Sequence, residues 1–183
     1  SGLSYQEKKQ SGQTGIVILL AFLFVFLFLA AQYESWSVPI AVLMSLPAAC
    51  IGAFIGIGIF GLENNVYFQI GIVMLIGMAA KNAILIVEFA KEQVEKGVDV
   101  VEAAVIAGTM RFRPIVMTSL TFILGMLPLL WASGPGSVSR QSIGVGIFSG
   151  MLVAMTIGII LVPFFFVWIY KIKERVKSKR ENK

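Results

Sequence analysis

The run GIVILLAFLFVFLFLAAQ, residues 15–32, decides the fold class because it contains no charged residue. The apolar core of a bilayer is about 30 Å thick. A helix needs about 20 apolar residues to cross it, and every backbone N–H and C=O must be hydrogen-bonded within the segment. This run is therefore predicted to be a membrane-spanning helix.

Four further runs have the same character. The chain of 183 residues is 57% hydrophobic and 14% charged, and its mean hydropathy of +0.87 is far above that of a soluble domain. We predict spans at about 15–32, 38–60, 66–90, 114–132 and 143–170. We expect residues 1–12 to be the turn-rich end of a loop outside the cytoplasm, residues 13–172 to be a transmembrane domain, and residues 173–183 to be a basic cytoplasmic tail.

The segment between the third and fourth spans is polar but carries apolar residues at helical spacing. These are Val98, Val101, Ala104, Val105 and Gly108. We predict an amphipathic helix over about 98–110 that lies along the cytoplasmic membrane surface. The fold class is therefore an all-α integral membrane protein with five transmembrane helices and one surface helix.

Lysine and arginine set the orientation, because loops rich in them stay in the cytoplasm. The loop between the third and fourth spans carries four of them, and the C-terminal end carries seven more. The N-terminal end should then lie outside the cytoplasm and the C-terminus inside it, although Lys8 and Lys9 weigh slightly against this. Topology and anionic lipid account for the net charge of +5, so we expect no nucleic acid partner.

Histidine is absent and Cys50 is the single cysteine, which excludes a disulfide framework and the usual zinc sites. We interpret Cys50 as a packing residue. The chain begins Ser-Gly and lacks a signal-peptide pattern, so we interpret it as a fragment or a processed piece. Pro47 should kink the second span. Small residues recur every four positions at Gly146, Gly150 and Ala154, which indicates a helix-packing seam.

Lys81 is the anomaly of the third span, because it lies seven residues before Glu88 and ten before Lys91. At about 1.5 Å per residue this places it roughly 10–15 Å inside the cytoplasmic boundary. A charge there costs at least about 2.5–3.5 kcal/mol in lipid, so Lys81 should face a protein interior and meet a carboxylate. A fixed structural ion pair would meet that requirement as well as a functional site.

No acidic residue of this chain is placed to be that partner. Glu88 falls on nearly the same helix face as Lys81 but about 10 Å further along the axis, which suits an interfacial role. No Asp or Glu lies deep within any span. The partner of Lys81 is therefore expected outside this chain or in a water-filled cavity.

Arg111 and Thr118 repeat the spacing of seven residues on the fourth helix, with Arg111 at the cytoplasmic rim. The hydroxyl of Thr118 can donate and accept, which suits a relay of protons or water. Threonine in a spanning helix more often bonds its own backbone, so both interpretations stay open.

Two blocks carry a family resemblance: GLENNVYFQIGIVMLIGMAAKNAILIVEFAK (61–91) and MRFRPIVMTSLTFILGMLPL (110–129). Together they resemble the C-terminal half of a resistance-nodulation-division (RND) drug efflux transporter of the AcrB type, in the hydrophobe/amphiphile efflux family. YESWS (33–37) and GLSYQE (2–7) fit the same family. The resemblance covers essentially the whole chain.

The resemblance implies a secondary active transporter rather than an enzyme: a homotrimeric drug/H⁺ antiporter of the bacterial inner membrane. Each subunit would have twelve spans, of which these would be the last five. It implies H⁺ as the coupling ion and no cofactor. The implied partners are a periplasmic adaptor, an outer-membrane channel, lipid, and hydrophobic or amphiphilic drugs.

The resemblance also implies roles for single residues. Lys81 matches the family's relay lysine, which pairs with two aspartates on a helix of the N-terminal half. Thr118 and Arg111 match the threonine and arginine of that relay, and Asn82 follows the lysine as in the family. The family commonly reads Asn-Asp-Val-Tyr where this chain has Asn65 at the second position, which puts a carboxylate role there in doubt.

Two alternatives remain. One is a non-transporting membrane scaffold that assembles through its glycine stripes, with Lys81 as an assembly contact. The other is an RND relative with different cargo, such as a metal ion, a lipid or an exported protein. Metal exporters should show intramembrane carboxylates or methionine pairs, whereas the eight methionines here are scattered. A large periplasmic domain and a helix with two adjacent aspartates upstream would argue against a scaffold.

Overall fold

The computed structural model describes residues 2–33 and 36–181, and all of its regular elements are helical. They are α1 (Gly2–Tyr33), α2 (Ser37–Phe60), α3 (Val66–Glu95), α4 (Val100–Leu130), α5 (Ser137–Val153), the π-helical turn η1 (Ala154–Gly158) and α6 (Ile159–Glu181). Five helical segments are long and apolar enough to cross a membrane: α1 to α4, and the continuous stretch from α5 through η1 to α6. The predicted all-α membrane fold with five spans is confirmed.

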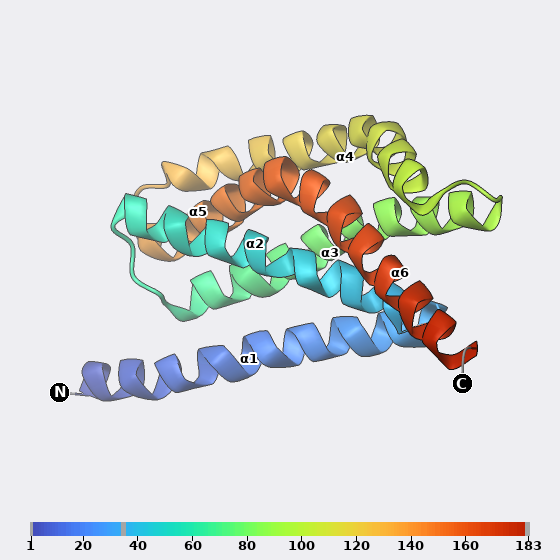
Figure 1. The fold of residues 1–183 in the computed structure, drawn as a ribbon. Helices are drawn as coiled ribbons and strands as arrows, with labels where there is room; N and C mark the ends of the chain where they lie inside the picture. Colours follow the sequence, from blue (N-terminus) through green and yellow to red (C-terminus); the bar gives the residue numbers. More distant parts are fainter. Residues whose placement is uncertain (1, 34–35, 182–183) are drawn as a thin grey trace.

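The helices run back and forth along one long axis (Figure 1). The connections α2–α3 and α4–α5 lie at one end, and the connection α3–α4 lies at the other end with the C-terminal part of α6. In the described chain α5 packs against α2, α3 and α4, whereas α1 contacts α2 and α3. The core therefore centres on α5, and α1 lies at the edge of the bundle.

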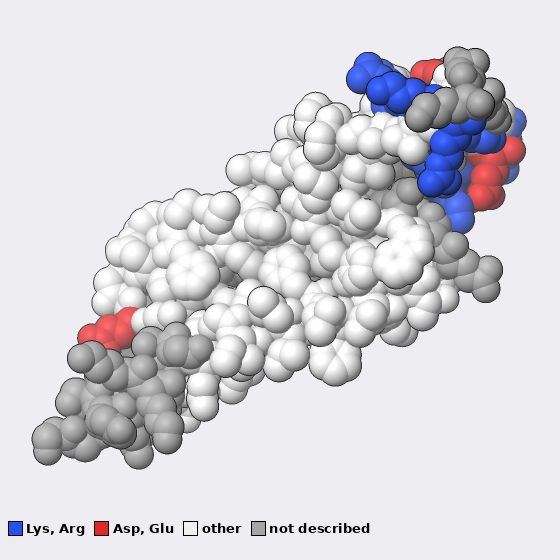
Figure 2. Space-filling view, turned by 60° about the horizontal axis from the view of Figure 1, so that its bottom comes forward, with Lys and Arg blue, Asp and Glu red and all other residues white. Residues whose placement is uncertain are grey.

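On the face that Figure 2 shows, charged side chains gather at the two ends of the long axis, and the surface between them is uncharged. The larger cluster, rich in Lys and Arg, lies at one end of this face. An apolar band between two charged ends is the distribution that a bilayer requires.

The predicted surface helix is not a separate element. Residues 100–130 form one unbroken helix, α4, whose first part lies at a steep angle to the rest in Figure 1. Pro114 lies inside α4. Proline lacks an N–H and clashes with the carbonyl four residues before it, so it bends a helix without ending it.

The apolar stripe of this segment also differs from the prediction. The buried face consists of Val100, Ala103, Ala104 and Ala107, which pack on the bundle. Val101 and Val105 are 43% and 62% exposed. Ala104 is the member of the predicted stripe that is buried as expected. The small side chains of the buried alanines permit the close approach of two helices.

The opening segment is helical, which corrects the expected turn-rich loop: α1 begins at Gly2. Residues 6–10, QEKKQ, are good helix formers, so a helix fixed by the apolar run can extend beyond it. The fifth span also differs from a simple helix because it contains η1, a few residues before Pro163.

The glycine seam of α5 is confirmed. A Cβ at Gly146 would lie 2.7 Å from the ring of Phe68, and one at Gly150 would collide with Leu75. Phe68 and Leu75 are fully buried on α3. These glycines therefore let α3 approach the backbone of α5.

Candidate functional site

Lys81 lies on the outer face of the five-helix bundle, where its side chain is exposed. It borders a surface hollow of about 500 Å³ between α3 and α1, here called the α1–α3 hollow. The α1 side of this hollow is entirely apolar and includes Phe24, Val25, Phe28 and Leu29. The interior of this bundle does not contain Lys81, so whatever neutralises the ammonium must approach from outside the bundle.

The described chain contains two ion pairs, and neither includes Lys81. Lys91 pairs with Glu95 at 3.8 Å, and Lys96 pairs with Glu92 at 2.7 Å. Both pairs lie at the C-terminal end of α3, with side chains that are mostly exposed. An unpaired lysine in the middle of a spanning helix is unstable in lipid, so its position requires a further anionic or aqueous neighbour.

Asn82, the residue after Lys81, points in a different direction, into the contact between α3 and α4. Its amide nitrogen donates a hydrogen bond of 3.1 Å to the hydroxyl of Ser119. Ser119 is fully buried. The bond joins the two helices that carry the predicted site residues.

Thr118 is exposed and lines a second hollow of about 380 Å³ between α3 and α4, here called the α3–α4 hollow. Its hydroxyl donates to the carbonyls of Pro114 and Ile115, each at 3.1 Å. This is the common behaviour of threonine in a helix. The oxygen keeps acceptor capacity toward the hollow because a hydroxyl has two lone pairs.

Arg111 lies seven residues before Thr118, on the other side of Pro114. Its guanidinium carbon lies 5.1 Å from the centre of the Phe89 ring of α3, a cation–π geometry. Its Nε is buried and has no hydrogen-bond partner among the described residues. Because its ring contact is to Phe89 rather than to Thr118 or Lys81, Arg111 forms a separate α3–α4 contact.

The structure thus brings all four predicted residues onto the α3–α4 pair but does not join them into one chain of contacts. Lys81 opens to the α1–α3 hollow, and Thr118 opens to the α3–α4 hollow. Met78 lines the second hollow from α3, one turn before Lys81, so both hollows border the same stretch of α3.

Sequence reasoning missed Ser119 as the partner of Asn82. The two residues are 37 positions apart, and neither charge nor spacing links them. It also missed Asn65, whose amide nitrogen donates to the Ser142 hydroxyl of α5 at 2.8 Å. For Ser119 the only available signal is a small polar residue in an apolar run, and this signal does not identify a partner.

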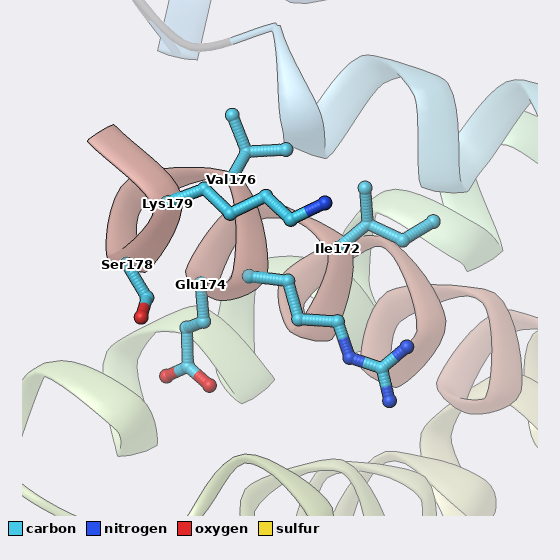
Figure 3. A pocket seen from close by; sticks show the side chains of 6 residues that line it. Ile172, Glu174, Val176, Ser178 and Lys179 are labelled. Atoms are coloured by element: carbon cyan, nitrogen blue, oxygen red, sulfur yellow. The ribbon is translucent and has the colours of Figure 1, made fainter. Parts of the chain in front are cut away.

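The described residues offer little to a metal ion, because they contain no group of three His, Cys, Asp or Glu side chains placed to hold one. The hollow of about 580 Å³ shown in Figure 3 is lined by α6 residues near the C-terminus, among them Glu174 and Lys179. These two side chains point to different sides of the helix. This open face of one exposed helix lies far along the chain from Lys81 and belongs to no predicted site.

Comparison with protein families gives a match to the family described as AcrB/AcrD/AcrF, over residues 1–170. The match includes α1 to α5 and most of α6, and therefore all four predicted site residues.

Similar proteins agree with this match. The chain is 53% identical over 167 residues to the toluene efflux pump membrane transporter TtgB of Pseudomonas putida, which covers 91% of this chain and 16% of TtgB. It is 48% identical over 168 residues to the multidrug export protein AcrF of Escherichia coli, with 91% and 16% covered. It is 47% identical over 179 residues to the multidrug resistance protein MdtF of the same species, with 97% and 17% covered. The chain thus spans about one sixth of the length of these relatives.

Proposed function

The chain belongs to the AcrB/AcrD/AcrF family, as its resemblance to RND transporters predicted, and from this premise we propose that it forms part of a proton-driven drug efflux pump. The observation that carries the proposal is Lys81, an exposed ammonium in the middle of a spanning helix with no carboxylate partner in the described chain. A pump that couples protons to movement needs a charge whose partner can be protonated.

The proposed partners are two aspartates on a helix of the rest of the transporter, which would approach the outer face of α3. While they are ionised, they hold Lys81. Protonation of an aspartate removes a charge-assisted hydrogen bond and lets α3 take a second position. Because Asn82 is hydrogen-bonded to Ser119, a shift of α3 would carry α4 with it.

The other two residues would act at the edges of this step. In the proposal Thr118 supplies a hydroxyl on the α3–α4 hollow that orients water or a proton acceptor. Arg111, stacked on Phe89, would hold the cytoplasmic ends of α3 and α4 together while their middle parts move.

The rest of the proposal concerns the whole transporter. It would be a homotrimeric secondary active transporter of the bacterial inner membrane that exchanges hydrophobic or amphiphilic drugs for H⁺, without a cofactor. In this chain the α2–α3 connection would face the periplasm, and the C-terminus would face the cytoplasm. A periplasmic adaptor and an outer-membrane channel would complete the export path.

The test is drug efflux by the full-length protein carrying Lys81→Ala, expressed in cells that lack their own efflux pumps. We expect efflux to fall to the level of cells without the protein, at unchanged amounts of protein in the membrane. Lys96→Ala is the control, because it removes a lysine at the end of the same helix that lies in an exposed ion pair. Near-normal efflux by Lys81→Ala would contradict the proposed role of Lys81 in a proton relay.

The scaffold alternative predicts a different result, because a non-transporting protein gives no drug efflux even in its wild-type form. In that case Lys81→Ala would reduce only the amount of assembled protein in the membrane. A pump for metal ions is less favoured, because metal exporters should show intramembrane carboxylates or methionine pairs, whereas the eight methionines of this chain are scattered.

A further inference from the structure

A small cavity lies where α2, α3 and α4 meet η1 and the start of α6. Its volume is about 20 Å³, and its lining includes Ser45, Asn82, Ile115, Gly158 and Ile159. A cavity needs roughly 10–15 Å³ to hold one water molecule, and the water needs two to four polar partners. The size therefore fits one water, and the polar lining decides whether water is stable there.

Asn82 and Ser45 both line this cavity, and each side chain has an oxygen with acceptor capacity. Asn82 uses its amide nitrogen to bond Ser119, and its amide oxygen takes no hydrogen bond from the described residues. Ser45 is only 7% exposed and donates its hydroxyl proton to the carbonyl of Val42 at 2.6 Å. Its oxygen lone pairs remain available.

A backbone carbonyl next to the cavity also lacks its usual hydrogen-bond donor. The carbonyl of Ile159 would normally accept from the N–H of residue 163, but residue 163 is Pro and has none. The preceding turn, Ala154–Gly158, is π-helical, a local widening that often marks a functional position. In membrane helices, water is one of the means by which such carbonyls are satisfied.

We propose that this cavity is a binding site for a single internal water, which donates its two protons to Asn82 Oδ1 and Ser45 Oγ. The water links α2 to α3 beside η1, on the opposite side of Asn82 from Ser119. A bridge of this kind can re-form after a small helix shift, because water rotates to new partners. The inference concerns the packing of this chain and does not depend on the proposed transport activity.

The first test is an electron cryo-microscopy map of the full-length protein, at a resolution that shows ordered waters in the spans. We expect a density peak at hydrogen-bond distance from both Asn82 Oδ1 and Ser45 Oγ. A map that shows other internal waters but none here overturns the proposal. A peak with ligand distances near about 2.4 Å also overturns it, because that spacing belongs to a bound cation.

The second test separates the effect of losing the water from the effect of losing the hydrogen bond between Ser45 and the carbonyl of Val42. Ser45→Ala removes an acceptor of the water as well as the bond to Val42. The matched control is Ser149→Ala, which removes a bond of equal length, 2.6 Å to the carbonyl of Val145, from a serine that does not line the cavity.

We expect Ser45→Ala to lose the density peak and to lower the melting temperature, while Ser149→Ala leaves both unchanged. An equal fall in both variants, or a peak that persists in Ser45→Ala, overturns the role given to Ser45. If Ser45→Ala does not fold, the wild-type map alone decides.

Discussion

Neighbouring polar residues on α3 and α4 point in different directions, one exposed and the next into a contact between helices, and helix geometry explains why. Lys81 is exposed, whereas Asn82 bonds Ser119 inside the α3–α4 contact. Thr118 opens to a hollow, whereas Ser119 is fully buried. Successive residues of a helix differ in direction by about 100°. A motif of adjacent polar residues can therefore supply both a functional group and the bond that holds its helix.

The proposed role of Thr118 can be tested against Thr121, a second threonine of the same helix. Thr121 lines the same hollow and also donates to its own helix, to the carbonyl of Met117 at 2.8 Å. If Thr118 serves the proposed relay, Thr118→Val should reduce drug efflux at least about tenfold, the scale of a lost proton-transfer group. Thr121→Val should leave efflux within about twofold, because it keeps the proposed relay threonine.

Both valine variants preserve the size of the side chain, and both remove the hydroxyl that donates to the backbone. The measurement is the initial rate of dye efflux at equal amounts of membrane protein. Equal rates for the two variants would show that the hydroxyl of Thr118 does no more than bond its own helix.

Asn65 has two structural roles, because it caps α3 and also bonds this helix to α5. Its side-chain oxygen accepts from the N–H of Phe68 at 2.9 Å, and its nitrogen donates to Ser142. Ser142 in turn donates to the carbonyl of Val138 at 2.8 Å, so it is an acceptor toward Asn65. An amide satisfies both contacts, whereas an ionised carboxylate can make only the first without a change at Ser142.

We therefore expect Asn65→Ala to lower the free energy of unfolding by about 1–2 kcal/mol, the effect of a lost helix cap and a lost hydrogen bond. Asn65→Asp should lose less at neutral pH, because it keeps the cap. Thermal unfolding of the purified full-length protein measures both. A larger loss with Asp than with Ala would contradict this account.

The glycine seam is a property of two elements together. Glycine to alanine in a helix normally stabilises it by up to about 1 kcal/mol. At Gly146 the new Cβ would press on the ring of Phe68, which is fully buried and cannot move aside. Gly146→Ala should therefore lower the melting temperature despite the better helix propensity, since overpacking costs about 1–3 kcal/mol.

The control is Gly58→Ala, also within a spanning helix, where a Cβ would meet nothing within 4 Å. This change should leave the melting temperature unchanged or raise it. A parallel fall in both variants would indicate a general intolerance of α2 and α5 to substitution rather than a seam between α5 and α3.

At the scale of the whole molecule, the charges at the two ends predict how the chain lies in the membrane (Figure 2). The end formed by the α3–α4 connection and the C-terminal part of α6 carries most of the lysine and arginine, so it should face the cytoplasm. The α2–α3 connection, which contains Glu63 and no lysine or arginine, should face the periplasm.

Single cysteines test this orientation in a full-length protein in which Cys50 and every cysteine outside this chain have been replaced by alanine. A membrane-impermeant thiol reagent applied to intact cells should label Glu63→Cys and leave Lys96→Cys unlabelled until the cells are opened. Glu63 and Lys96 are both exposed, at opposite ends of α3. The reverse pattern would contradict the predicted topology.

The sequence alone determined the number of spans, their approximate positions and the odd place of Lys81. These are local properties, because a spanning helix satisfies its backbone within its own segment and needs about 20 apolar residues. The motifs around Lys81 and Thr118 also indicated the family, which the comparisons confirmed. The roles of Lys81, Asn82, Arg111 and Thr118 remain predictions that the experiments above address.

Only the tertiary structure decided which face of each helix meets which neighbour. It placed Lys81 outside the bundle, paired Asn82 with Ser119, joined the predicted surface helix to the fourth span, and put Phe68 against Gly146. The physical reason is that such contacts depend on the fit between side chains far apart in the sequence. In lipid, no difference in hydrophobicity marks the inner face of a helix, so close packing and hydrogen bonds select it instead.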